Sequence, residues 1–414
     1  MKKLLILGGF PQNIDIIMTA KEMGIFTIVV DREDSSPAKR FADKSIKLST
    51  SDLDKLEELC KVEGVDGVFT GFEDYNIHVA KKLSKRLNLP FYATEEQLST
   101  ITDKKSFKDC CRRYEVPVVE EYTLDEAINE GKYPYIIKPV DSYGSRGITV
   151  CSREEELLLG YKKACESSQK GHAIIERFID NDHGIELFYT IVNGKVRLTV
   201  TADRYVVRDG KTTVPLPIAE VFPSKHRAEF GELDGKIRSM IQGMGLYSGL
   251  VLVQALYKDG EIFVYEMAYR LTGEQHYRLV EKQWGVSLAK MMIKLSLGED
   301  VSEFDTDLLE DNAFVYPSVN YAVILSEGQI GKLDGLEKVF QIDEVISYNL
   351  THTKGDYIKP SGDYSHMLIR INMVAKDFEK LKRAISMVND YVVVESEDGK
   401  DMVISRMNTQ ILEN

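Results

Sequence analysis

Short apolar runs alternate with helical patterns through the first hundred residues of the chain. Strands are predicted at residues 4–7, 26–30 and 65–70, and helices at 14–23 and 77–87. Strands that alternate with helices predict a parallel sheet with crossover helices, a Rossmann-like α/β arrangement. Ligands of such sheets bind beyond the carboxyl ends of the strands.

Glycines and acidic residues stand where these predicted strands end. Residues 8–10 (Gly-Gly-Phe) follow the first strand, and residues 71–74, which include Glu73, follow a later one. The first turn lacks the GxGxxG pattern of dinucleotide-binding folds, which disfavours a nicotinamide cofactor. A ligand-free tight turn and a substrate-facing turn both fit it. Glu73 is the candidate substrate contact at this edge.

The pattern changes near residue 99 and again near residue 310. Helices predicted at 104–114 and 154–165 flank strands at 135–138 and 148–151, and β-rich stretches follow at 173–202 and 250–267. The last segment predicts strands at 313–325, 367–374, 391–396 and 402–404 and a helix at 378–387. Strands beside helices predict α+β layers. We therefore expect an N-terminal α/β domain (1–98), a central domain (99–310) with a small lid (about 107–172), and a C-terminal α+β domain (311–414).

Composition narrows the class of protein. The 414 residues carry a formal net charge of −13, which gives no general attraction for nucleic acid. The five cysteines form no metal-binding pattern, and their odd number suits a reducing compartment. The first apolar run is too short for a signal peptide, and no stretch approaches the roughly 20 apolar residues of a membrane span. We expect a cytoplasmic protein without a membrane or nucleic-acid partner.

A lysine that ends an apolar strand is the first sign of chemistry. Lys138 closes the run at 135–138, and a Gly-Ser-Arg-Gly turn at 144–147 follows it. A charge at such a place needs an anion, and a glycine-rich turn can direct backbone N–H groups toward phosphate. The pair indicates a phosphate-binding hairpin without the GK[ST] of a P-loop. A surface lysine beside an ordinary hairpin is the alternative.

A second apolar strand ends in a carboxylate. Glu176 closes it and is followed by Phe178 and Ile179. Such a segment can bind adenine through a polar acceptor, backbone groups and apolar walls. An edge-strand glutamate without a ligand is the more common explanation.

Residues 249–270 read as a β-hairpin that turns at Asp259-Gly260. Pairing across the turn would bring Gln254 and Glu266 together, and such hard oxygen donors bind Mg²⁺ beside phosphates. Arg270, just beyond the hairpin, can grip a carboxylate or a phosphoryl oxygen in bidentate fashion. A plain hairpin with a surface salt bridge is the alternative.

In order and spacing these elements resemble the ATP-grasp superfamily, from Met1 to about residue 395. The resemblance implies a leading α/β domain, a central ATP-grasp fold with a lid, and a trailing domain. It also implies that Lys104 and Lys138 hold ATP phosphates and that Gln254 and Glu266 hold the metal. The other implied nucleotide contacts are the lid residues Ser142, Gly144, Ser145 and Gly147, the adenine-binding Glu176, Phe178 and Ile179, and either His183 or Glu186 at the ribose.

The chain departs from the superfamily in its metal motif. The usual Glu-x-Asn-x-Arg is here Glu266-Met-Ala268-Tyr-Arg270, and alanine cannot bind a metal, which leaves a second ion open. N5-carboxyaminoimidazole ribonucleotide synthases also carry alanine there and are active. Gln254 resembles the metal-binding glutamine of carbamoyl phosphate synthetases. His276 stands in a segment similar to one in the N5-carboxyaminoimidazole ribonucleotide synthases, and this similarity implies a substrate contact for His276.

The trailing segment narrows the resemblance further. Residues 331–337, 354–356 and 391–394 are similar to the C-terminal domain of L-amino-acid ligase-type carboxylate–amine ligases. This implies a ligase that uses ATP and Mg²⁺, with Mn²⁺ as an alternative, to join a small-molecule carboxylate to an amine. The reaction would pass through an acyl phosphate and release ADP and phosphate. Lys138 and Arg270 are the expected catalytic residues, and Arg270 would also hold the substrate.

Two other functions stay open. One is an ATP-dependent carboxylase that acts through carboxyphosphate. The other is a non-catalytic nucleotide-binding regulatory protein, for which Ala268 is the only support in the sequence. The identity of the substrates and the oligomeric state, a homodimer included, stay open as well.

Overall fold

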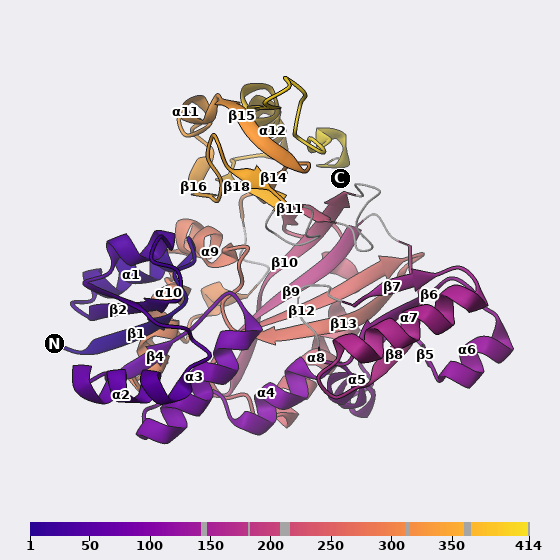
Figure 1. Ribbon diagram of the computed structural model, residues 1–414, viewed down its shortest axis with the longest axis horizontal. Helices are drawn as coiled ribbons and strands as arrows, with labels where there is room; N and C mark the ends of the chain where they lie inside the picture. The colour runs from indigo at the N-terminus through magenta and orange to yellow at the C-terminus, as the bar shows by residue number, and fades with distance from the viewer. Residues whose placement is uncertain (142–146, 181–182, 208–215, 311–314, 360–365, 413–414) are drawn as a thin grey trace.

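The computed structural model describes residues 1–141, 147–180, 183–207, 216–310, 315–359 and 366–412, with His183 described by its backbone alone. Four sheets form within these residues, and Figure 1 shows them from indigo at the N-terminus to yellow at the C-terminus. In the described residues no helix is long and apolar enough to cross a membrane.

A parallel sheet of order β3-β2-β1-β4 forms the N-terminal part, at left in Figure 1. Its elements are β1 (Lys3–Leu7), α1 (Asn13–Glu22), β2 (Phe26–Asp31), η1 (Pro37–Phe41), β3 (Lys44–Lys47), α2 (Leu53–Glu63), β4 (Gly67–Phe69) and α3 (Asp74–Leu87). The predicted parallel α/β arrangement is confirmed, with β4 shorter than predicted.

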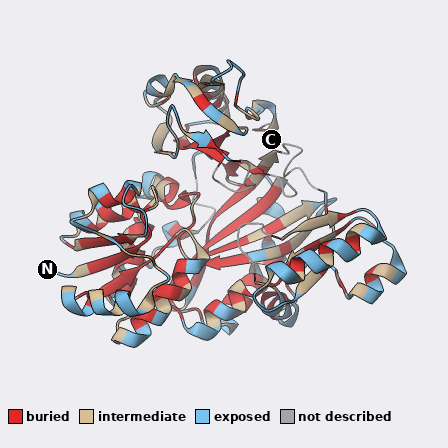
Figure 2. Cartoon of the chain, viewed as in Figure 1, coloured by how far each residue is buried: buried red, intermediate tan, exposed pale blue. Residues whose placement is uncertain are grey.

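Both faces of this sheet are buried. Leu4 and Ile6 of β1 belong to the apolar cluster that includes α1 and α10 (Leu288–Ser296), whereas Leu5 and Leu7 pack with α2 and α3. Strands buried on both faces are usual in parallel sheets, and Figure 2 shows them in red. A Cβ on Gly67 would lie 2.2 Å from the Ser296 carbonyl oxygen, so α10 packs closely against β4.

An antiparallel sheet of order β5-β8-β6-β7 lies at the opposite end of the molecule, at right in Figure 1. The chain enters it through α4 (Glu95–Thr102) and α5 (Lys104–Arg113), and its elements are β5 (Glu121–Tyr122), α6 (Leu124–Glu130), β6 (Tyr135–Pro139), β7 (Thr149–Cys151), α7 (Glu154–Ser167) and β8 (Ala173–Arg177). Tyr135 and Ile137 of β6 pack against Leu157 and Ala164 of α7.

The large sheet has the order β13-β12-β9-β10-β11-β14-β18-β16 and is antiparallel between all paired strands. Its strands are β9 (His183–Val192), β10 (Lys195–Val207), β11 (Leu216–Phe222), β12 (Gly249–Lys258), β13 (Glu261–Tyr269), β14 (Ser318–Ile324), β16 (Val345–Leu350) and β18 (Met367–Val374), and η2 (Arg227–Glu229), α8 (Gly231–Gly243) and α9 (His276–Trp284) connect them with α10. The predicted hairpin is confirmed, and its turn residues Asp259 and Gly260 have positive φ angles of 54° and 84°. The sheet continues from this hairpin into the C-terminal segment.

A small antiparallel sheet of order β17-β15-β19 completes the C-terminal segment. The remaining elements are η3 (Ser302–Phe304), η4 (Asp307–Leu309), β15 (Gly328–Asp334), α11 (Leu336–Val339), β17 (Tyr357–Ile358), α12 (Phe378–Tyr391), β19 (Val393–Ser396) and η7 (Thr409–Leu412). The α+β class predicted here is confirmed, but the strand predicted at 402–404 is wrong. Met402 is buried, yet the backbone beside it forms only isolated bridges, to Leu325 and to Glu395. The division of the chain at residues 98 and 310 stays a prediction.

Candidate active site

A row of polar side chains crosses one face of the large sheet. Residues paired across neighbouring strands point to the same face. The pairs are Glu266–Gln254, Gln254–Glu186, Arg204–Glu220, Glu220–Asn320 and Asn320–Asn372, and Glu186 pairs with Ala202, which lies two residues before Arg204. Both predicted metal ligands therefore stand at the β13 end of one continuous polar row.

The two predicted metal ligands are cross-strand neighbours on the β12–β13 hairpin. Gln254 donates its amide Nε2–H to Glu186 Oε1 at 2.6 Å, which leaves the Gln254 amide oxygen as an acceptor. Glu266 is exposed. No group of three or more His, Cys, Asp or Glu side chains in the described residues could hold a metal ion by itself. One amide oxygen and one carboxylate fit Mg²⁺ that takes its remaining ligands from phosphates and water.

Buried carboxylates continue the row beside Gln254. Burial raises the pKa of Glu186 to about 7, against the opposing charge of Arg204, whose Nε lies 3.4 Å from Glu186 Oε1. Burial also raises the pKa of Glu220 well above its usual value, and the neighbouring Glu186 and Glu274 carboxylates add to the effect. Glu186 is fully buried, and its predicted part in ribose binding stays a prediction.

Two lysines share one buried carboxylate near the lid. Glu176 Oε2 lies 2.7 Å from Lys138 Nζ, and Glu176 Oε1 lies 2.7 Å from Lys108 Nζ. Lys108 Nζ also donates to the Val119 carbonyl oxygen at 3.0 Å. Lys138 Nζ lies 5.8 Å from the centre of the Tyr265 ring on β13. The lysine of β6 therefore lies beside the β12–β13 hairpin.

Lys104 belongs to the same group of charges. Its backbone N–H donates to the Val140 carbonyl oxygen at 3.0 Å, which fixes the start of α5 against the end of β6. Burial lowers the pKa of Lys104, the nearby Glu266 carboxylate opposes this, and the Lys138 ammonium adds to it. Lys104, Lys138 and Glu266, which lie far apart in the sequence, are thus electrostatic neighbours.

The remaining predicted nucleotide contacts are placed as follows. Phe178 donates its backbone N–H to the Pro134 carbonyl oxygen at 3.0 Å, and Ile179 is buried. Gly147 has a φ of 77°, and a Cβ there would lie 2.7 Å from Pro139. Gly147 therefore packs closely against the end of β6. Ser142, Gly144 and Ser145 lie outside the described residues, as does the His183 side chain. Their roles toward ATP stay predictions.

Arg270 is held in place by the N-terminal part. Its Nε and Nη2 donate to Asp74 Oδ1 at 2.7 Å and Oδ2 at 3.0 Å, and its Nη1 donates to the Leu271 carbonyl oxygen at 3.1 Å. Burial opposes the ionisation of Asp74, but the Arg270 guanidinium outweighs it and lowers the pKa of that carboxyl. Glu73 is the neighbour of Asp74 at the start of α3. The predicted substrate contacts Glu73 and Arg270 therefore lie together.

His276, the third predicted substrate contact, is a buried neutral imidazole. Its ring lies 4.1 Å from the Phe188 ring centre, and its Nδ1 is 3.1 Å from Thr272 Oγ1. Burial lowers its pKa to about 3, against the opposing Glu274 carboxylate. Its contact with a substrate stays a prediction.

The pKa of His276 predicts acid sensitivity. The unfolded chain binds a proton here below about pH 6.5, whereas the folded chain does so only near pH 3. This group therefore contributes stability above pH 6.5 that is lost as the pH falls. Between pH 7.5 and 5.0 we expect wild type to lose about 2 kcal/mol more free energy of unfolding than His276→Phe, measured by urea denaturation. Parallel losses in the two proteins would contradict this assignment.

Some residues of the site could not be identified from the sequence pattern. Lys108 lies in a helix rich in charged residues, and nothing in its neighbours marks it as buried. Glu220 and Asn320 gave a better signal, because each is an isolated polar residue inside an apolar strand. Such positions are costly unless a partner or a ligand is present.

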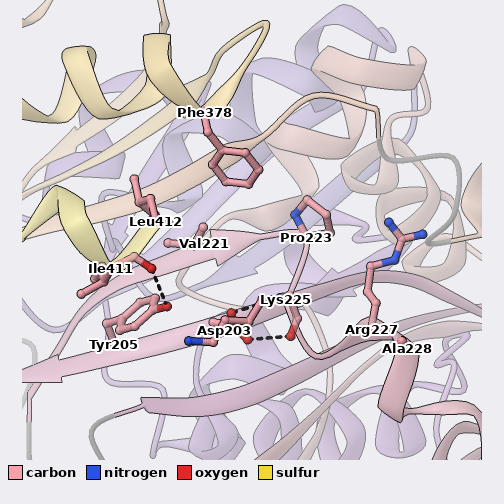
Figure 3. Close-up of a pocket in the computed structure, with 11 residues that line it drawn as sticks. Asp203, Tyr205, Val221, Pro223, Lys225, Arg227, Ala228, Phe378, Ile411 and Leu412 are labelled. Carbon is pink, nitrogen blue, oxygen red and sulfur yellow. Dashed lines mark hydrogen bonds between the residues drawn. The ribbon is translucent and has the colours of Figure 1, made fainter. Parts of the chain in front are cut away.

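Two cavities formed by described residues bear on the site, and only the smaller one is lined by strands of the large sheet. One, of about 1010 Å³, opens beside Glu73 and Asp74. The other, of about 430 Å³, is lined by Asp203, Tyr205 and Val221, which alternate with Arg204 and Glu220 along their strands and so lie on the opposite face (Figure 3). There Ser224 Oγ donates to Asp203 at 2.6 Å. Only the larger cavity adjoins the candidate active site.

Comparison with known proteins gives two family matches. Residues 103–304 match the family described as the ATP-binding domain of the carbamoyl-phosphate synthase L chain, and residues 1–101 match the ribonucleotide synthetase preATP-grasp domain. The 2-oxoglutarate carboxylase small subunit of Hydrogenobacter thermophilus is 24% identical over 333 residues, which are 74% of this chain and 69% of that protein. The carbamoyl phosphate synthase large chain, C-terminal section, of Methanocaldococcus jannaschii is 24% identical over 375 residues, which are 82% of this chain but 58% of that protein.

Solved structures give the same picture of the fold. The L-amino acid ligase of Bacillus licheniformis superposes on this chain with a TM-score of 0.78 at 19% sequence identity. The superposition covers 96% of this chain and 99% of that ligase. Similarity at this identity establishes the fold and not the substrate. The chain therefore carries a match to a preATP-grasp domain at residues 1–101, followed by a match to an ATP-grasp ATP-binding domain at residues 103–304, and it shares the fold of an ATP-grasp ligase.

Proposed function

We propose that this protein is an ATP-dependent carboxylate–amine ligase that works through an acyl phosphate. The observation that carries the proposal is the convergence of Lys104, Lys138 and Glu266 at one end of the polar row. Cations beside a carboxylate that is open to solvent suit a nucleotide triphosphate with its metal. Arg270, fixed by Asp74, stands beyond the same hairpin, where the substrate carboxylate would bind.

The charged side chains divide the work of binding ATP. Lys104 and Lys138 would hold its phosphates, and Gln254 and Glu266 would hold Mg²⁺. When bound, Mg²⁺ neutralises charge on the phosphates. Since Lys138 shares Glu176 with Lys108, the phosphates would compete with Glu176 for Lys138. The Lys108–Glu176 pair would then keep the buried carboxylate compensated.

The chemistry needs two substitutions. First, an oxygen of the substrate carboxylate attacks the γ-phosphorus of ATP, the bond to the β-phosphate oxygen breaks, and ADP leaves. Arg270 would hold the carboxylate in line through a bidentate contact. Second, the amine attacks the acyl carbon, the bond to the phosphate oxygen breaks, and phosphate leaves. Arg270 would then stabilise the charge on the tetrahedral oxyanion.

An isotope experiment tests this sequence of bonds. Candidate acids labelled with ¹⁸O in the carboxylate are incubated with ATP, Mg²⁺ and a panel of amines, and phosphate is examined by mass spectrometry. We expect one ¹⁸O per phosphate released, because the acyl phosphate passes its bridging oxygen to phosphate. Amide formation with AMP, or phosphate without label, would contradict the proposal.

A carboxylase is the second candidate, and the Hydrogenobacter relative named as a carboxylase favours it. In that reaction bicarbonate takes the place of the organic acid. Labelled bicarbonate with the amine panel would then give labelled phosphate, whereas the organic acids would give none. If neither set of substrates releases ADP while ATP still binds, the chain is a regulatory nucleotide-binding protein instead.

A further inference from the structure

The larger cavity lies where the N-terminal sheet meets the lid. Its volume is about 1010 Å³. Part of the lining comes from the carboxyl ends of the N-terminal strands, where Gly9 follows β1, Asp31 ends β2 and Glu73 follows β4. Other lining residues are Asp141, two residues after β6, and Gln169, two residues after α7. The space is large enough for a molecule the size of a sugar or an amino acid.

Negative charge dominates the described lining of this cavity. Its charged residues are the acidic Asp31, Glu33, Glu73, Asp74 and Asp141 and the basic Arg32. Arg32 is 79% exposed and lies 3.4 Å from the Glu33 carboxylate. Asp74 is paired with Arg270. The charge of the remaining carboxylates is therefore balanced by no other described lysine or arginine of the lining.

Asp31 and Glu73 are the carboxylates placed to meet a ligand. The Asp31 carboxylate accepts from the backbone N–H of Gly9 at 2.7 Å and of Glu33 at 2.8 Å, which are neutral donors. Burial raises the pKa of Glu73, against the opposing charge of Arg270, and the Asp74 and Asp31 carboxylates add to the rise. A cation between Glu73 and Asp31 would relieve this repulsion.

Asn76 supplies a second observation in the same wall, where a hydrogen bond from its side chain to Glu73 partly offsets the rise in the pKa of Glu73. The Asn76 side chain is 2% exposed and lines the cavity. Its amide oxygen has no hydrogen-bond donor among the described residues. A buried acceptor without a donor is costly, and a ligand N–H would satisfy it. The Asn76 amide oxygen therefore favours a ligand with an N–H donor, and the surrounding carboxylates favour a ligand with positive charge.

We propose that this cavity binds the amine substrate as a cation, and that it selects amines without a phosphate group. The proposal rests on the carboxylate–amine ligase function above. A phosphate would enter a field of carboxylates with Arg32 as its nearest described cation in the lining, although residues 1–101 match the ribonucleotide synthetase preATP-grasp domain. Asp74 joins the cavity to Arg270, so the amine would lie beside the acyl phosphate. The ammonium group first loses one proton to solvent, and the lone pair this frees on the nitrogen attacks the acyl carbon. As the C–O bond to phosphate then breaks, phosphate takes the second proton from the nitrogen.

Calorimetry on the full chain tests the selectivity without turnover. The probes are glucosamine, ethanolamine and lysinamide, together with glucosamine 6-phosphate and O-phosphoethanolamine as phosphorylated partners. We expect at least one unphosphorylated amine to bind, and about tenfold more tightly than its phosphorylated partner where it has one. Equal or tighter binding of the phosphorylated partner, or no binding of any unphosphorylated amine at millimolar concentration, would overturn the proposal.

Variants locate the binding in the cavity. Glu73→Gln should weaken the best amine about tenfold, and Thr50→Lys, which adds a cation to the lining, should weaken it further while improving the phosphorylated partner. Glu58→Gln, an exposed change on α2 outside the lining, should leave both affinities unchanged. Unchanged affinity in Glu73→Gln and Thr50→Lys would refute the site. ADP release with a phosphorylated amine would refute the selectivity alone, whereas no ADP release with any pair would refute the ligase function.

Discussion

Glu266→Gln is expected to lower the rate of ADP release about 10²–10³-fold, because it removes the only carboxylate of the proposed metal pair. The amide keeps the shape and polarity of the side chain but not its charge. Glu266 is exposed, so the variant should unfold at the same urea concentration as wild type. Steady-state ADP release at saturating ATP and Mg²⁺ measures the effect.

The same strand offers a matched control. Glu261 is also an exposed glutamate of β13 and stands at the hairpin turn, paired with Lys258. Glu261→Gln should keep the wild-type rate within about twofold, since it changes the same charge at a distance from the phosphates. Equal rates in Glu266→Gln and wild type would remove Glu266 from the metal site. Equal losses in both variants would point to the net charge of the hairpin instead.

Much of the fold could be predicted because it depends on local patterns. Alternating apolar runs and helices gave the parallel N-terminal sheet, and Asp259-Gly260 gave the turn of the β12–β13 hairpin. The strand predicted at 402–404 failed because its three residues are apolar and pack in one cluster, whereas the backbone at Asp401 and Val403 forms isolated bridges to different segments. A pattern of side chains predicts burial but does not specify the strand that supplies the hydrogen bonds.

The site could be predicted only where its residues lie close together in the sequence. The hairpin turn predicted that the two strands pair, but a β-bulge between Gln254 and Ala255 shifts the register by one residue. This shift, which the turn does not specify, places Gln254 opposite Glu266 and not opposite Tyr265. The contact of Arg270 with Asp74 joins residues 196 positions apart, and no local pattern contains it. The continuation of the polar row through Glu220 and Asn320 depends on β14 joining the same sheet as β11, which is a property of the whole topology.

Glu176→Leu is expected to lower the free energy of unfolding by about 3–5 kcal/mol. The loss arises because Lys108, whose side chain is 1% exposed, loses the nearer of its two carboxylate partners and keeps only Glu121, whose Oε1 lies 3.5 Å from Lys108 Nζ. Lys138 is more exposed and can turn toward solvent, so Lys108 accounts for most of the loss. Urea denaturation followed by circular dichroism measures the change. A loss below about 1 kcal/mol would show that the pair is not formed in solution.

Replacing both Lys108 and Glu176 separates the cost of an unpaired charge from the cost of altered packing. The double variant Lys108→Met with Glu176→Leu should recover most of the lost stability, since two apolar side chains then fill a buried space without an unpaired charge. Asp109→Asn is the matched control on the same helix, because it breaks the exposed pair of Asp109 with Lys105 and should cost about 0–1 kcal/mol. If the double variant were as unstable as Glu176→Leu, the loss would come from the cavity and not from the charge. Nucleotide binding by the double variant, read by calorimetry, would then show whether Lys138 binds phosphate once it no longer shares Glu176.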